Sequence, residues 1–280
     1  MKDKLLKELI ATALAEDVGD GDHTSLACIP ENAEGNAKLI IKQKGILAGA
    51  EVAEKIFSII DPSVKFISFM KDGAVVEHGD IVFHVSGHIQ SILKSERLVL
   101  NIMQRMSGIA TVTREYADML TGLKTKILDT RKTSPGLRFL EKEAVRIGGG
   151  VNHRIGLYDM ILLKDNHIDY AGGIKKAILL VNDYLLRNNL KQKIEIEARS
   201  IDDVKIIIET GGIDIIMLDN FNIADLKSAV NLINGKYETE ASGGITLETI
   251  RSYAECGVDF ISVGALTHHI KSLDMSLKAF

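Results

Sequence analysis

Cationic side chains concentrate in one short stretch of this sequence, between Arg131 and His167. The stretch holds seven Lys or Arg residues against four Asp or Glu residues, although the whole chain has a formal net charge of −4. The cations stand in two segments rich in turn-forming residues, Asp129–Gly136 and Gly148–Arg154, and at Lys164. Clustered guanidinium and ammonium groups on short connections suit a small molecule that carries several negative charges. The sequence therefore predicts a pocket for a polyanion.

The composition is that of an ordinary globular protein, and its charge argues against a nucleic-acid partner. Of the 280 residues, 46% are apolar and 26% are charged, which is enough for one large core or two smaller ones. A pI near 6.1 lacks the basic surplus of a nucleic-acid-binding protein. No stretch reaches the roughly 18 apolar residues of a membrane span, and Cys28 and Cys256 stand apart from any metal-ligand pattern. We expect a reduced, cytoplasmic protein with no nucleic-acid or membrane partner.

The first part of the chain must provide a framework of mixed helices and strands. Apolar residues at helical spacing predict a helix over residues 4–18, and residues 37–86 contain short β-type runs separated by turns and interrupted by one helix near 51–60. This pattern is typical of a small α/β sandwich. A long helix follows over about 91–120 and carries Arg105 among apolar residues. Such an arginine is either paired locally or delivered to a pocket.

After residue 124 strands and helices alternate to the end of the chain. Helical patterns at 174–190, 201–210, 223–233 and 247–256 separate most of the strands, and the strands are apolar on both faces. This alternation predicts a parallel sheet covered by helices. The strand candidates are residues 126–128, 160–163, 194–197, 213–218, 237–241 and 260–263.

Each strand candidate is followed by polar residues or glycine. In order along the chain these are Arg131 and Lys132, Lys164 to Asn166, Glu197, Asp219 and Asn220, Ser242 to Gly244, and Gly264. In βα barrels the active site is built from the carboxyl ends of several strands. We therefore favour a barrel, or a partly open barrel, over an open doubly wound sheet.

Two of these strand ends resemble phosphate sites. Ser242, Gly243 and Gly244 lie between a strand and a predicted helix, so main-chain N–H groups and a helix N-terminus would face one point. Gly264 follows the next strand, which matches the phosphate site that barrels build from their last two loops. The alternative is that both loops are tight turns that need glycine for a left-handed conformation.

Two carboxylates stand at consecutive strand ends, Glu197 and Asp219. They could approach one another at the barrel mouth, where paired carboxylates serve as acid and base, hold ribose hydroxyls or bind Mg²⁺ beside a phosphorylated substrate. Because the other groups of the site demand no acid and base, we favour ribose and metal. A glycosidase would not need so many cations nearby.

The remaining cations predict a second anion. Arg131, His153, Arg154 and Lys164 together suit a small diacid, because arginine presents a planar fork to a carboxylate and lysine a point charge. Lys164 could instead form a Schiff base, as in class I aldolases, but such lysines prefer apolar surroundings.

Taken together, these motifs resemble those of the quinolinate phosphoribosyltransferase family over nearly the whole chain. The residues that carry the resemblance are Glu16-Asp17 with Gly21-Asp22 and Thr24, Glu96-Arg97, Asn101, Gln104-Arg105, Ser107 to Thr111, Asp129 to Thr133, Gly148 to Gly150, His153-Arg154, Leu163-Lys164, Asn166-His167, Glu195, Glu197, Leu218 to Asn220, Glu240 to Ile245, Ser262 to Gly264 and Leu266 to His268. The motif departs from the family at its end, where His269 follows His268 in place of the usual small residue.

The resemblance implies an α/β sandwich domain followed by an incomplete, open parallel α/β barrel. We place the sandwich at residues 1–110 and the barrel at 111–269, and we expect a C-terminal helix at 270–280 that packs back on the sandwich. The resemblance also implies a homodimer in which the N-terminal domain of one subunit completes the active site of the other. It leaves open whether the dimers assemble into a higher oligomer.

The activity implied is that of a pentosyltransferase, the carboxylating nicotinate-nucleotide diphosphorylases of NAD biosynthesis. Its substrates would be quinolinate and 5-phosphoribosyl 1-pyrophosphate, with Mg²⁺ as cofactor. Carried over by position, the quinolinate carboxylates would be bound by Arg131, His153, Arg154 and Lys164, with Arg105 from the partner subunit. Phosphoribosyl pyrophosphate and Mg²⁺ would be served by Lys132, Glu197, Asp219, Ser242, Gly243, Gly244, Gly264 and His268, the carboxylates holding the metal directly or through water.

Three other functions fit parts of the sequence. A relative that acts on nicotinate would share the fold without decarboxylation, but four cations around a monocarboxylate would be excessive. An aldolase-like barrel would use Lys164 as a Schiff base. A metabolite sensor would bind the same ligands without turnover and would not need Glu197 or Asp219.

Overall fold

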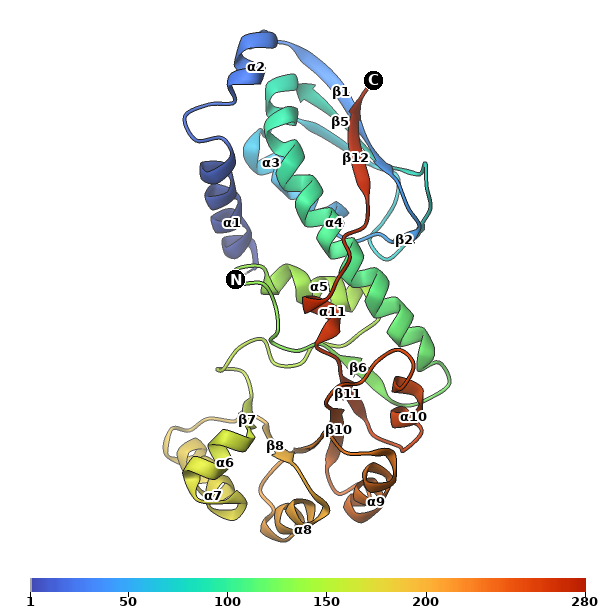
Figure 1. The fold of residues 1–280 in the computed structure, drawn as a ribbon. Coiled ribbons are helices and arrows are strands. Elements are labelled where there is room, and N and C mark those ends of the chain that lie inside the picture. Colours follow the sequence, from blue (N-terminus) through green and yellow to red (C-terminus); the bar gives the residue numbers. More distant parts are fainter. Residues whose placement is uncertain (1) are drawn as a thin grey trace. The chain divides into compact units, whose positions relative to one another are not determined.

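The computed structural model describes residues 2–280, which form two compact units (Figure 1). The first unit contains the chain up to Arg114, together with Thr133–Gly149 and Leu266–Phe280. The second contains Glu115–Lys132 and Gly150–Ala265. Within the described residues, none of the helices is both long and apolar enough to cross a membrane.

The first unit is built on an antiparallel sheet with strand order β12-β1-β5-β3. These strands are β1 (Glu34–Ile41), β3 (Lys65–Ser68), β5 (Ile81–His88) and β12 (Met275–Ala279), and a small pair is formed by β2 (Gly45–Ile46) and β4 (Val75–Val76). Its helices are α1 (Lys2–Asp17), α2 (His23–Cys28), α3 (Ala50–Ile60), most of α4 (Ile89–Met119), α5 (Arg138–Gly148) and most of α11 (Ala265–His268).

The core of this unit follows from the alternation of side chains along its strands. In β1 the side chains of Leu39 and Ile41 are fully buried, whereas the intervening residues are partly exposed. Phe57 on α3 and Phe83 on β5 pack with Phe66 on β3, with centroid separations of 6.1 Å from Phe57 to each of the others and 4.4 Å between those two. Figure 1 shows α3 and α4 lying along one side of the sheet. The predicted α/β sandwich is thus confirmed.

The C-terminal segment is a strand, and the predicted helix over 270–280 is wrong. Residues 275–279 form β12, which pairs antiparallel with β1. The reason is a period of two: Leu273, Met275 and Leu277 are buried, while the residues between them are not. In a helix Leu273 and Leu277 would share one face, but Met275 would lie on the opposite, exposed side.

The second unit is a six-stranded parallel sheet with order β6-β11-β10-β9-β8-β7. The strands are β6 (Lys126–Leu128), β7 (Ile161–Leu163), β8 (Ile194–Ala198), β9 (Ile215–Asp219), β10 (Glu238–Ser242) and β11 (Phe260–Ser262). The helices are α6 (Asp165–Ala171), α7 (Ile174–Arg187), α8 (Ile201–Thr210), α9 (Ile223–Ile233) and α10 (Ile250–Ala254). Figure 1 shows α7, α8, α9 and α10 ranged around the outside of this sheet.

The sheet does not close. Among the described residues β6 and β7 are its two edges, and they are not paired with each other. The prediction of an incomplete parallel barrel is therefore confirmed. Because all six strands run in the same direction, their carboxyl ends lie at one rim, where the predicted site residues of this unit follow.

Candidate active site

At the rim of the second unit, Lys164 and Glu197 form an ion pair. Lys164 follows β7 and Glu197 lies in β8, and the register that pairs Leu163 with Ile196 brings the next residues together. Lys164 Nζ lies 2.7 Å from Glu197 Oε1, and the main-chain N–H of Asp165 donates to Glu197 Oε2 at 3.0 Å. The Glu197 carboxylate is 9% exposed, so both of its oxygens are held in a nearly buried position.

Asp219 has a different set of neighbours from Glu197. The two predicted partners do not align across the sheet, because Glu197 is paired with Met217 while Asp219 is paired with Ser242 on β10. The side-chain amide of Asn220 donates to Asp219 Oδ2 at 2.7 Å. Each carboxylate is thus held by its own partners, although both stand at the same rim.

These partners decide how a divalent cation would fit. Mg²⁺ is held in proteins by one or two carboxylates together with water and substrate phosphates. Asp219 is half-buried at the rim and is engaged by a neutral amide, so it fits that role. Glu197 faces the ammonium group of Lys164, and a directly bound cation there would have to compete with it. The donor set therefore fits an ion carried by Asp219 and water better than one clamped directly by both acids.

Two guanidinium groups repel each other in the loop region after β6. Arg154 is 9% exposed, and its side chain donates to the carbonyl of Met160 at 3.2 Å. Burial lowers the pKa of Arg154, and the positive charge of Arg131 lowers it further, while the carboxylates of Glu195 and Glu197 oppose the shift. A half-buried pair of like charges is stabilised by an anion that contacts both.

His153 belongs to a buried cluster that sequence reasoning did not assign a role. Its Nε2 lies 2.9 Å from Glu195 Oε2 and 3.4 Å from Glu240 Oε2, and one ligand atom from each of the three residues falls within 4.8 Å of the others. Burial lowers the pKa of His153, but the two carboxylates outweigh it and hold the pKa above its ordinary value. Burial, followed by the charge of Glu240, raises the pKa of Glu195.

A signal for these residues was present in the sequence. Glu195 and Glu197 alternate with isoleucine in β8, and Glu240 lies in β10 between buried neighbours. Charged residues in strands that are otherwise buried on both faces are rarely tolerated without a partner. Asp129, fully buried after β6, was also not assigned a role, and it accepts a hydrogen bond from the main-chain N–H of His153 at 2.9 Å.

The glycine loop after β10 is built differently from the prediction. Gly243 and Gly244 have φ values of 102° and 60°, so both need the left-handed freedom of glycine. A Cβ on Gly243 would collide with Asn220, whereas one on Gly244 would meet open space. The predicted helix at 247–256 is only α10, which begins at Ile250. The loop therefore offers main-chain N–H groups, and the predicted contribution from a helix N-terminus at Gly244 is wrong.

Gly264 does not share that conformation. It is absent from the left-handed glycines, so a tight turn is not the reason for glycine at this strand end. Of the predicted phosphate-binding positions, Ser242 is partly buried at the end of β10 and Gly264 follows β11 on the neighbouring strand. Lys132 is exposed beyond β6, which neighbours β11 on its other side.

Two predicted site residues belong to the first unit. Arg105 on α4 is paired locally: its Nε donates to Glu141 Oε1 at 2.7 Å, and its Nη2 donates to Ser134 Oγ at 2.9 Å and to the carbonyl of Thr267 at 3.2 Å. The side chain of Arg105 is 28% exposed. His268 ends α11, and both it and His269 are exposed, with their rings edge to face at 4.2 Å.

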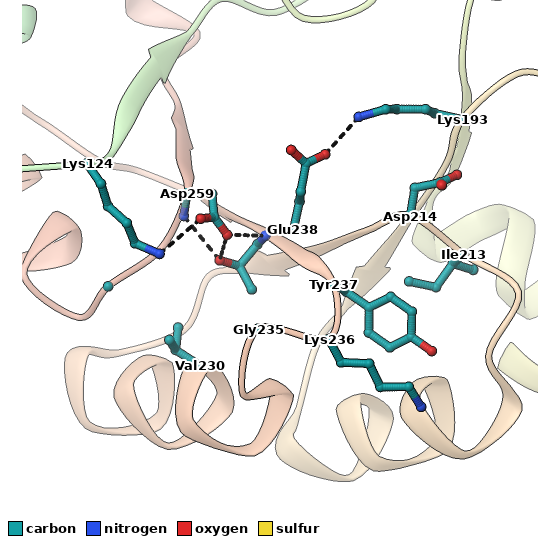
Figure 2. Close-up of a pocket in the computed structure, with 12 residues that line it drawn as sticks. Lys124, Lys193, Ile213, Asp214, Val230, Gly235, Lys236, Tyr237, Glu238 and Asp259 are labelled. Atoms are coloured by element: carbon teal, nitrogen blue, oxygen red, sulfur yellow. Dashed lines mark hydrogen bonds and ion pairs between the residues drawn. The ribbon is translucent and has the colours of Figure 1, made fainter.

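A cavity of about 470 Å³ lies at the opposite ends of the strands (Figure 2). Most of its lining residues precede or begin the strands, and four of its charged groups form two ion pairs. Lys124 Nζ contacts Asp259 Oδ1 at 3.0 Å, and Lys193 Nζ contacts Glu238 Oε2 at 2.8 Å, as Figure 2 shows. The amino-terminal face of a barrel is the structural one, so this cavity is not the active-site candidate.

The sequence matches both domains of one protein family. Residues 22–107 match the N-terminal domain described as quinolinate phosphoribosyl transferase, and residues 109–278 match the C-terminal domain of the same description. The chain belongs to the quinolinate phosphoribosyltransferase family. It is 48% identical to the chloroplastic nicotinate-nucleotide pyrophosphorylase [carboxylating] of Arabidopsis thaliana, over 98% of this chain and 82% of that protein. It is 42% identical to the probable nicotinate-nucleotide pyrophosphorylase [carboxylating] of Bacillus subtilis (strain 168), over 97% of this chain and 92% of the relative.

Solved structures of the family share its fold. NadC from Streptococcus pyogenes has a TM-score of 0.92 at 38% identity, with 98% of this chain and 97% of that chain covered. The nicotinate-nucleotide pyrophosphorylase from Francisella tularensis has a TM-score of 0.92 at 39% identity, with 99% and 96% covered. The family resemblance drawn from the motifs is thus confirmed.

Proposed function

We propose that this chain transfers the phosphoribosyl group of 5-phosphoribosyl 1-pyrophosphate to quinolinate and decarboxylates the product. The products are nicotinate mononucleotide, pyrophosphate and CO2, a step of NAD biosynthesis. The observation that carries this proposal is the buried guanidinium of Arg154 beside the partly buried Arg131, where burial first and then the charge of Arg131 lower the pKa of Arg154. Such a pair calls for an anion with two carboxylates, beside a rim that also carries a glycine loop.

The cationic residues at the rim fall into two groups, one for each reactant. Arg131, Arg154 and Lys164, with His153, form the half of the site that receives the diacid. Lys132 follows Arg131 directly and serves the pyrophosphate. Main-chain N–H groups of Gly243 and Gly244 then donate to phosphate oxygens, and the space beside the Cα of Gly244 is open. Arg131 and Lys132, although adjacent in the chain, thus bind different substrates.

The reaction needs positioning more than an activated nucleophile. The ring nitrogen of quinolinate attacks the ribose carbon as pyrophosphate leaves, so the protein must align the two and neutralise the departing charge. The new bond gives the ring nitrogen a positive charge. That charge stabilises the electron pair left on the ring carbon when the neighbouring carboxylate departs as CO2, and the carbon then takes a proton from water to give nicotinate mononucleotide. Arginines that bind this carboxylate therefore select the diacid before the chemistry begins.

A magnesium ion belongs to this proposal, held by Asp219 and by water. When bound, Mg²⁺ would supply positive charge to the pyrophosphate oxygens. In this arrangement the ammonium group of Lys164 neutralises the charge of Glu197. The remaining lone pairs of the Glu197 carboxylate can still accept hydrogen bonds from ribose hydroxyls.

A homodimer with a shared site is part of the same proposal. Glu141, Ser134 and Thr267 hold Nε and Nη2 of Arg105. This fixes the guanidinium and leaves Nη1 for an anion on a second subunit. An arginine pre-oriented in this way loses less entropy on binding than a mobile one.

The activity is tested by incubating the purified protein with quinolinate, phosphoribosyl pyrophosphate and Mg²⁺. Released CO2 and nicotinate mononucleotide should form in equal amounts. Nicotinate in place of quinolinate is the control for the diacid, and it should react poorly because one carboxylate leaves Arg131 and Arg154 incompletely paired. A folded protein that forms neither product from quinolinate would refute the proposal.

Subunit exchange tests the shared site. Arg105→Ala and Arg131→Ala variants should each have low activity alone at limiting quinolinate, and mixing them should raise it, because some mixed dimers contain one intact site. Failure of exchanged mixtures to regain activity would contradict a site built from two subunits.

A further inference from the structure

Two buried glutamates converge on His153 from neighbouring parts of the sheet. Glu195 on β8 and Glu240 on β10 are 0% and 1% exposed. Within the described residues, both carboxylate oxygens of Glu195 and Oε1 of Glu240 are buried without a partner at hydrogen-bond geometry, although Glu195 Oε2 lies within ion-pair distance of the His153 ring. The ring of His153 lies beside both carboxylates, with its Nε2 at 2.9 Å from Glu195 Oε2 and 3.4 Å from Glu240 Oε2. Two acids removed from water are costly unless a positive or proton-donating group lies between them.

The other side of the imidazole is fixed by the main chain. The N–H of Arg154 donates to His153 Nδ1 at 2.7 Å. Since Nδ1 accepts this hydrogen bond, the ring proton lies on Nε2, where it faces the glutamates. The N–H of His153 donates in turn to the buried carboxylate of Asp129 at 2.9 Å. The ring therefore bridges the sheet interior and the backbone of the residue that carries the diacid-binding guanidinium.

We propose that Glu195 and Glu240 are positioning residues that hold His153, and through it the main chain of Arg154, in place for diacid binding. The proposal rests on the role of Arg154 in the proposed function. It assigns His153 a task besides substrate contact, since the ring anchors the loop that follows Gly150 to strands β8 and β10. Neither glutamate needs to touch the substrate for this role.

A metal ion is the main alternative occupant of this cluster. Two carboxylates and one imidazole resemble a metal-ligand set. A bound divalent cation would have to replace the Nε2 proton, which already lies between the carboxylates. The hydrogen bond from Arg154 to Nδ1 is compatible with either a proton or a metal ion on Nε2, so an experiment must distinguish the two.

The proposal is tested with Glu195→Gln and Glu240→Gln in the full-length protein. Each change keeps the side-chain volume and removes one acceptor charge from His153. We expect the KM for quinolinate to rise about 10-fold or more, as when outer partners of other functional histidines are removed. The KM for phosphoribosyl pyrophosphate should stay within about two-fold. A rise in KM for quinolinate alone would indicate a positioning defect at the diacid site. A general loss of folded protein would not raise the KM for one substrate selectively.

Two controls make the result specific. Glu238→Gln, two residues earlier in β10, removes an exposed acid paired with Lys193 and should leave both KM values unchanged. Nitrogen-15 NMR of the His153 ring, assigned with a His153→Asn variant, reads the ring directly. The native protein should show the proton on Nε2 in a strong hydrogen bond, and both glutamine variants should weaken that hydrogen bond.

The outcomes separate the positioning proposal from the proposed function. If the native protein made no nicotinate mononucleotide, the function would fail, while the ring NMR would still decide whether the glutamates hold His153. Unchanged ring signals in both variants, or equal rises in both KM values, would overturn the positioning role. One tightly bound Zn²⁺ or Mn²⁺ per native chain in equilibrium dialysis, lost in Glu195→Gln, would overturn it in favour of a metal site.

Discussion

Replacing Arg105 with alanine is expected to destabilise the protein as well as to impair quinolinate binding. The guanidinium is the counter-ion of Glu141, whose side chain is 1% exposed. Without Arg105, the remaining hydrogen-bond donor to the buried carboxylate, among the residues that the structure describes, is the N–H of Ser134, at 3.2 Å and 3.4 Å from its two oxygens. Breaking a buried ion pair by removing one partner costs about 3–5 kcal/mol, because the other charge is left uncompensated.

The lower end of this range is expected here. The Arg105 side chain is 28% exposed, so water already screens part of the pair, and Ser134 still donates to the carboxylate after the substitution. We expect a loss of about 3 kcal/mol in the free energy of unfolding. For a protein of this size, that corresponds to a fall in Tm of roughly 6–12 °C. Urea unfolding and thermal melting measure the two quantities.

The double variant Arg105→Ala/Glu141→Gln separates stability from activity. Glutamine keeps an oxygen for the N–H of Ser134 but carries no charge, so the double variant should be more stable than Arg105→Ala alone. It should not regain activity, because the guanidinium proposed to reach quinolinate is still missing. If the two substitutions destabilised additively, the buried charge would not be the cause. If the double variant recovered full activity, Arg105 would have no role beyond folding.

Three further expectations concern the diacid site and the first unit. Arg131→Ala should weaken quinolinate binding by about 1.5–3 kcal/mol, the usual worth of a charged hydrogen bond, whereas Arg187→Ala on the exposed face of α7 should not. Gly108→Ala should cost about 1–3 kcal/mol of stability, because the new methyl group would collide with the main chain of residues 271 and 272. Hydrogen bonds from Ser63 hold the pKa of Asp61 well below its usual range, so Asp61→Asn should destabilise at neutral pH and cost progressively less below about pH 4.

The sign of the pH effect follows from proton binding. A carboxyl whose pKa is lower in the folded state stabilises the protein above its unfolded pKa, and this stabilisation is lost as pH falls. An Asp61→Asn penalty equal at pH 3 and pH 7 would contradict that account.

Calorimetric measurement of quinolinate binding tests the Arg131→Ala prediction, with Arg187→Ala as its matched control. Native-like stability of Gly108→Ala would show that the C-terminal segment can move away from α4.

Local periodicity was sufficient to predict most of the elements. The alternation after residue 124 gave the six strands in order and predicted a parallel barrel, closed or partly open, because the pattern depends on neighbouring residues alone. That the barrel is incomplete was implied by the family resemblance. The one element predicted in the wrong class, at 270–280, is short and carries three apolar residues two apart. Its conformation is decided by β1, which offers an unpaired edge to β12. The period of two was visible in the sequence, but only the edge of β1, contributed from more than 200 residues away, decides that so short a segment forms a strand.

The sequence by itself determined which residues reach the rim of the barrel, since each follows a strand whose direction is fixed by its neighbours. Only the tertiary structure decided how those residues are paired. Glu197 was expected to lie close to Asp219, but the register of β7 on β8 places Lys164 beside Glu197, and the two form an ion pair. His153 was expected to meet only substrate, yet Glu195 and Glu240 converge on its ring. Strand register and burial depend on segments that are far apart in the chain. They therefore determine which side chains pair and how their pKa values shift, and the spacing of residues along one strand does not reveal either.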